Sequence, residues 1–153
     1  MDSAAGISLL NFNDEDRILL SQAYEIINPD IDRVLDSLYE SLDRINSGPD
    51  SFGSSNFSLK LKQKSHWVRL FSGCFDEDYE NEARKVAVRH VEIGLPHDLF
   101  VLSYMKIAVL FCEVIRETPG VDPDRAIRMV EAINKAVAID MMFAMAPYAG
   151  DLV

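Results

Sequence analysis

A histidine on the apolar face of a predicted helix is the residue of this chain best suited to hold a metal. Read at helical spacing, the segment 84–95 places His90 among apolar neighbours. A buried imidazole needs a polar partner, and two kinds of partner fit. His90 is either a core residue hydrogen-bonded to a backbone carbonyl or a metal ligand. The predicted face contains Val86, Ala87, His90, Ile93 and Gly94.

The other chemical motifs are weak. His66, His90 and His97 match neither HExxH nor any other zinc spacing. Cys74 and Cys112 form no CxxC pair, and we expect free thiols rather than a disulfide. The acidic segment 76–80 lacks the central glycine of a calcium loop and fits the start of a helix. The sequence has no GxSxG, P-loop or GxGxxG motif, and we expect a protein that is not an enzyme.

Composition limits the class of protein and its partners. The 153 residues fit a single domain, 1–153, with one core. A net charge of −10 argues against nucleic acid as a partner, because phosphates require a basic surface. No apolar run is long enough to cross a membrane, and the N-terminus lacks the basic start of a signal peptide. We therefore expect a cytoplasmic protein without membrane contact.

The helical signals predict an all-α fold of six main helices and no strand. Residues 1–12 form an N-terminal extension, and the Gly- and Ser-rich segment 46–57 is a predicted flexible loop. Asn13 caps the first helix, Gly73 ends the third, and Asp98 caps the helix after Pro96. The predicted helices cover about 14–28, 29–45, 59–72, 76–93, 98–115 and 123–145.

The last two helices are apolar on most of their surface. Such helices either lie wrapped inside their own domain or bury a face against a second copy. Two adjacent helices of this kind favour a homodimer in which they form a four-helix bundle. The apolar residues that suggest this interface are Leu102, Val109, Val130, Val137, Met141 and Met145.

Three motifs in a fixed order indicate a family. HWxxLFxG spans 66–73, DxxY spans 76–79, and HxxIGLP spans 90–96. This order resembles the globin-coupled sensor family, bacterial haem-binding globins that usually precede a signalling module, and the resemblance covers about residues 13–148. It implies a globin fold in which a loop replaces the short helix before the distal helix.

The resemblance also implies roles for individual residues. His90 corresponds to the proximal haem ligand, and Tyr39 in LYESL corresponds to the distal tyrosine that hydrogen-bonds dioxygen. Tyr24 and Tyr104 are rival donors. Lys62 stands where relatives often carry a small hydroxyl residue, and Phe100 where they often carry tyrosine. The other residues expected at the haem are Leu59, Trp67, Leu70, Phe71 and Ile93.

Some of these expected haem contacts have simpler explanations. Core packing explains Trp67 and Phe71 as well as haem contact does. Lys60, Lys62 and Lys64 fit either a solvated helix face or contacts with haem propionates.

The implied function is a haem-based oxygen sensor. Because no CxxCH motif occurs, b-type haem would bind noncovalently, and carbon monoxide and nitric oxide would also be ligands. The output module, such as a diguanylate cyclase, chemotaxis transducer or histidine kinase, is absent from this chain. Two alternatives stay open. One is a cofactor-free helical domain that dimerises and regulates a partner. The other is a globin that stores oxygen or detoxifies nitric oxide.

Overall fold

The computed structural model describes residues 3–45, 57–92 and 94–149, and every regular element within these ranges is helical. The all-α prediction is therefore confirmed, with six long helices. A short helix, α1, is added inside the expected N-terminal extension, and Phe57 begins a helix rather than ending a loop. The rest of the predicted loop lies outside the described residues. The elements are α1 (Ser3–Leu9), α2 (Asp14–Ile27), η1 (Asn28–Asp30, a 3-10 turn), α3 (Ile31–Ile45), α4 (Phe57–Ser72), α5 (Glu77–Glu92), α6 (His97–Glu117) and α7 (Pro123–Ala149).

Local signals place the ends of these helices. The Asn13 side chain accepts from the Asp16 amide at 3.2 Å, while the Asp16 carboxylate accepts from the Asn13 amide at 3.0 Å, a reciprocal cap of α2. Gly73 follows α4 with φ of +67°, a conformation that costs glycine little. Its carbonyl accepts a hydrogen bond from Arg17 Nε at 3.0 Å, which ties this turn to α2. The helix after Pro96 begins at His97, one residue before the predicted cap, so Asp98 lies in its first turn.

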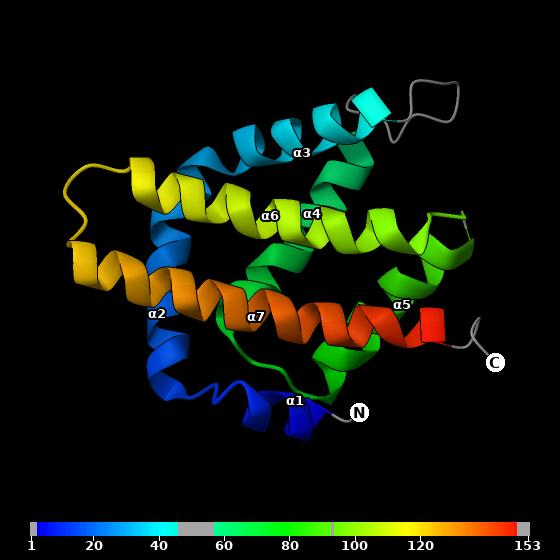
Figure 1. Cartoon of the computed structure of the whole chain (residues 1–153), viewed down its shortest axis with the longest axis horizontal. Coiled ribbons are helices and arrows are strands. Elements are labelled where there is room, and N and C mark those ends of the chain that lie inside the picture. Colours follow the sequence, from blue (N-terminus) through cyan, green and yellow to red (C-terminus); the bar gives the residue numbers. More distant parts are fainter. Residues whose placement is uncertain (1–2, 46–56, 93, 150–153) are drawn as a thin grey trace.

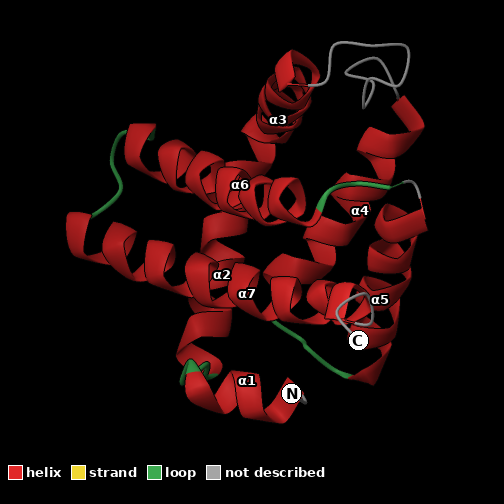
Figure 2. Cartoon of the chain, turned by 45° about the vertical axis from the view of Figure 1, so that its right-hand side comes forward, coloured by secondary structure: helices red, strands yellow, loops and turns green. Residues whose placement is uncertain are grey.

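The long helices pack in two layers that cross each other. Helices α6 and α7 run antiparallel and side by side, and α2 and α4 pass behind them at steep angles (Figure 1). Helix α5 packs along the C-terminal half of α7, and α3 lies beside the opposite side of α6 (Figure 2). Helix α7 contacts α1, α2, α4, α5 and α6. It is therefore the element around which the domain is assembled.

The apolar side chains form two clusters. The larger one joins buried residues of α2 to α7, and includes Trp67, Tyr79, Phe111 and Ile133. The smaller one lies where α5 ends and α6 begins, and contains Ala87, Leu95, Phe100 and Ala144. The end of α5 thus has a small core of its own, separate from the main one.

The burial of α6 and α7 corrects the predicted interface. Val137 is 2% exposed and belongs to the main core, because its side of α7 faces other helices of the same chain. Val130 also packs against this core. Leu102 and Val109 are 63% and 51% exposed. No helix in the described ranges is long and apolar enough to span a membrane.

Candidate functional site

His90 lies in the last turn of α5, and within the described part of the chain its ring makes one hydrogen bond. The Nδ1–H donates to the carbonyl of Val86, one turn earlier, at 2.7 Å. A proton on Nδ1 leaves Nε2 with a free lone pair, which is the tautomer of a histidine that binds a metal through Nε2. The hydrogen bond to the Val86 carbonyl fits the interpretation of His90 as a core residue. The lone pair on Nε2 fits its interpretation as a metal ligand, and the two are compatible.

The face of α5 that carries His90 is not the buried one. The residues of α5 that pack into the protein are Tyr79, Ala83 and Ala87, each one turn apart. Val86 is 39% exposed and His90 is partly exposed. The predicted inner face is therefore wrong for Val86, because α5 meets α7 along the line from Tyr79 to Ala87. His90 stands at the edge of this line, beside an apolar residue that no core covers.

The imidazole of His90 packs against an aromatic ring of α6. Its centroid lies 5.6 Å from that of Phe100 at an interplanar angle of 64°. Phe100 in turn lies 5.1 Å from the ring of Tyr104, one turn further along α6. The orientation of the imidazole is thus set on one side by the Val86 carbonyl and on another by Phe100.

Tyr39 is buried in α3 at 5% exposure. Burial raises the pKa of its phenol to about 12, so the hydroxyl keeps its proton and is a donor. The rival tyrosines are engaged elsewhere: Tyr24 donates to Asn28 Oδ1 at 3.2 Å, and Tyr104 donates to Asp140 Oδ2 at 2.8 Å. Within the described residues, the Tyr39 hydroxyl has no hydrogen-bond partner. Of the three candidates, it alone has a donor available for a ligand.

The predicted pocket residues of α4 lie mostly in the core. The rings of Trp67 and Phe71 pack against the ring of Phe111, with centroid distances of 4.8 Å and 5.1 Å. Both side chains are buried, as is Leu70. These contacts fit the core-packing interpretation. Leu59 is partly buried against the same cluster. Ile93 lies outside the described residues.

The three lysines of α4 differ in their partners. Lys60 pairs with Asp36 and Lys64 with Asp32, both on α3, so these two lysines join α4 to α3. Lys62 points to solvent and has no ion pair with another described residue. Of the three, Lys62 is the one whose ammonium group is available to an acidic group outside the chain.

The structure groups the predicted site residues in two places. Tyr39, Trp67, Leu70 and Phe71 share the main cluster, with Leu59 at its edge. His90 lies beside the smaller cluster. The proximal candidate His90 and the distal candidate Tyr39 thus lie on different helices and beside different apolar clusters.

Four helices meet at a buried carboxylate that the sequence analysis did not identify. Asp140 of α7 is 3% exposed. Its oxygens accept from Tyr79 of α5 at 2.5 Å and from Tyr104 of α6 at 2.8 Å. His66 Nε2 of α4 lies 2.9 Å and 3.0 Å from the same two oxygens. The sequence carried one signal for this group, a single acid inside the apolar run AVAIDMMFA. A carboxylate buried among apolar residues requires polar partners from elsewhere in the chain.

The groups around Asp140 titrate abnormally. Burial lowers the pKa of His66, but the hydrogen bond and negative charge of Asp140 outweigh burial and the nearby Arg69, so the pKa is raised from 6.5. Burial and then the Asp140 charge raise the pKa of Tyr79 far above its ordinary value. Tyr79 therefore stays a donor at any physiological pH.

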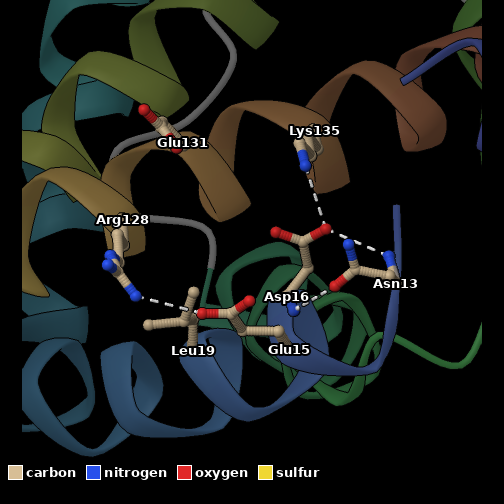
Figure 3. Close-up of a pocket in the computed structure, with 7 residues that line it drawn as sticks. All are labelled: Asn13, Glu15, Asp16, Leu19, Arg128, Glu131 and Lys135. Carbon is tan, nitrogen blue, oxygen red and sulfur yellow. Dashed lines mark hydrogen bonds and ion pairs between the residues drawn. The ribbon is translucent and has the colours of Figure 1, made fainter. Parts of the chain in front are cut away.

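A polar hollow lies elsewhere, between the start of α2 and α7. Its volume is about 280 Å³ and it is lined by charged side chains (Figure 3). Lys135 pairs with Asp16 at 3.0 Å and Arg128 with Glu15 at 3.2 Å, so the charges largely neutralise one another. Among the described residues no three His, Cys, Asp or Glu side chains gather as a metal-binding group. Cys74 and Cys112 are free thiols, as expected.

Comparison with known proteins places this arrangement in a family. The globin domain of a Geobacter sulfurreducens globin-coupled sensor superposes with a TM-score of 0.79. The match covers 95% of this chain and 96% of that domain, at 23% sequence identity, and it confirms the globin fold. The Protoglobin family model matches residues 4–152, almost the full length. The chain therefore belongs to the Protoglobin family.

Proposed function

We propose that this domain binds b-type haem through His90 and senses a diatomic gas. The observation that carries the proposal is the hydrogen bond from His90 Nδ1 to the Val86 carbonyl, which leaves Nε2 available. A backbone carbonyl in this position fixes the tautomer and makes the imidazole a stronger donor to a metal. Membership of the Protoglobin family supports haem as the cofactor.

The donor set fits a haem. The His90 imidazole would supply the protein ligand that a histidine-bound b-type haem needs. Val86 offers apolar surface one turn from His90, and Lys62 of α4 offers a cation for a propionate. Bound haem would supply the iron to which a gas binds. These protein groups would hold and orient the haem and would exclude water from it.

Tyr39 is the proposed distal donor, with dioxygen the proposed physiological ligand. A phenol in an apolar environment stabilises a ligand that carries partial negative charge, because few other dipoles compete there. The buried position of Tyr39 and its unengaged hydroxyl support this role. Leu59, partly buried beside the same cluster, would limit the space available to the ligand. Carbon monoxide and nitric oxide are further proposed ligands.

The proposed signal leaves through a homodimer of α6 and α7. Leu102, Met105 and Val109 recur at helical spacing on α6 and are 63%, 41% and 51% exposed. Ile127 of α7 is 61% exposed. An apolar stripe of this kind is typical of a surface covered by a partner. A change of ligand at the haem would alter the packing of these helices, and so reach a partner or an output module in the cytoplasm.

One experiment tests the haem assignment. The protein is expressed with haem available and its Soret absorption is compared with that of His90→Ala, with His97→Ala as a matched control, since His97 is exposed. We expect His90→Ala either to lose stoichiometric haem binding or to bind haem only when free imidazole is added. We expect His97→Ala to behave like the wild type. An identical coordination spectrum in His90→Ala would overturn the assignment. A colourless wild type that does not bind added haemin would favour the cofactor-free dimerisation domain, which the ring contacts of Trp67 and Phe71 with Phe111 also fit.

A further inference from the structure

Asp140 stands out because it is the buried acid of a helix that is otherwise apolar in this region. Lys135 is the nearest basic residue before it on α7, and that lysine pairs with Asp16 and not with Asp140. The carboxylate is instead held by donors from α4, α5 and α6. A charge this deep is costly unless every lone pair is used. The arrangement therefore fixes the positions of four helices relative to one carboxylate.

Two of these donors lead back to His90 by different routes. Tyr79 lies in the first turn of α5, the helix that carries His90 in its last turn. Tyr104 reaches His90 through ring contacts, because its ring packs on Phe100 and the ring of Phe100 packs on the imidazole. The hydroxyl bond to Asp140 holds the Tyr104 ring in one place, and this in turn limits Phe100.

We propose that Asp140 is a positioning residue for His90, which acts through the Tyr104–Phe100 contacts and links the imidazole to helix α7. The proposal rests on the proposed function for the meaning of His90, but not for the contacts themselves. Tyr104 joins the two parts of this link, since it packs against both apolar clusters while its hydroxyl donates to Asp140. Tyr79 and His66 keep the carboxylate in place when the Tyr104 bond is lost.

This link couples the position of helix α7 to the orientation of the His90 imidazole. A rotation of the imidazole that displaced Phe100 would strain or release the Tyr104 bond to α7. Conversely, a movement of α7 would change the packing against the imidazole. Packed side chains and a directed hydrogen bond are the kind of contiguous contact through which such coupling passes. The test must therefore read His90 directly.

The experiment follows the His90 ring protons by NMR in protein labelled at histidine. If the protein carries haem, the ferrous carbon monoxide state is used because it is diamagnetic. The variants are Tyr104→Phe, which removes the hydroxyl alone, and Asp140→Asn, which keeps the shape of the acceptor. Tyr24→Phe is the matched control, since it removes a tyrosine hydrogen bond on α2, to Asn28.

We expect Tyr104→Phe and Asp140→Asn to shift the His90 ring signals, and Tyr24→Phe to leave them in place. The double variant should shift them by less than the sum of the two single shifts, because both changes act on the same link. If Tyr104→Phe lowers the melting temperature but leaves the His90 signals unchanged, the bond is only structural and the proposal is wrong. If Tyr104→Phe does not fold, Asp140→Asn tests the same link and the same two outcomes decide. If the wild type binds no haem, the proposed function is wrong. The His90 signals can still be measured in the haem-free protein, and they would still decide this inference.

Discussion

Replacing Asp140 with alanine should lower the free energy of unfolding by about 3–5 kcal/mol, the usual cost of breaking a buried ion pair from one side. The carboxylate is 3% exposed and serves three donors, so its removal leaves each of them without a partner. The Tyr79 hydroxyl loses most, about 1–3 kcal/mol, because the side chain is buried and water cannot replace the acceptor. His66 loses less, since its side chain is 14% exposed and water can reach it.

The measurement is thermal and urea unfolding followed by circular dichroism. For a domain of this size about 1 kcal/mol corresponds to about 2–4 °C, so the melting temperature of Asp140→Ala should fall by about 6–20 °C. Asp140→Asn should lose less, because its carbonyl oxygen still accepts one phenol. Asp32→Ala is the control: Asp32 pairs with Lys64 but is 79% exposed, so the loss should be at most about 1 kcal/mol.

The reasoning is refuted if Asp140→Ala unfolds cooperatively within about 1 kcal/mol of Asp32→Ala, since a buried acceptor of three donors cannot be removed so cheaply. A change in the urea dependence without a change in midpoint would point to the unfolded state instead.

Three further predictions concern His66, Tyr39 and the surface of α6. The His66 pKa is raised in the folded state, so its contribution to stability is complete below the ordinary value of 6.5 and is lost as pH rises through the folded value. The stability difference between wild type and His66→Gln should therefore shrink on going from about pH 6 to about pH 8 in urea titrations, with Asp140, Tyr79, Tyr104 and Arg69 as the facing groups; a constant difference would contradict it. Tyr39→Phe should speed dioxygen dissociation by about one to two powers of ten in stopped-flow measurements, because a hydrogen bond worth about 1–3 kcal/mol is lost. Tyr24→Phe is its control, and equal rates in Tyr39→Phe and wild type would assign the donor elsewhere. Val109→Glu should shift the protein toward monomer in sedimentation with an unchanged Soret spectrum, whereas Ile18→Glu on α2, 59% exposed in the wild type, should not. A wild type that is monomeric at micromolar concentration would contradict the dimer.

The helices could be predicted because their signals are local. Asn13 caps α2 through contacts three residues away, and Gly73 ends α4 because glycine tolerates a positive φ. Such signals involve neighbours in sequence and do not depend on the rest of the fold. They gave the ends of the long helices within two residues, except for α7, which continues four residues further to Ala149. Helix α1 was missed because its seven residues are too few to show an apolar stripe.

Burial on a helix that is apolar nearly all round could not be predicted. In α7 the pattern does not say which side faces the core, and Val137 proved to be interior. On α5 the apolar stripe suggested that Val86 is buried, but contact with α7 follows the line from Tyr79 to Ala87 instead. Which face is covered depends on the crossing of helices that are distant in sequence.

The sequence by itself determined the helical elements, their caps and the family motifs, and it placed His90 on a helix. The tertiary structure decided what surrounds those residues. The His90 bond to Val86 is local, but the contact with Phe100 requires α6 to fold back onto α5. The convergence on Asp140 requires four helices at once, from residues up to 74 positions apart. Hydrogen bonds and ring contacts of this range depend on the packing of whole helices, and a linear pattern does not contain that information.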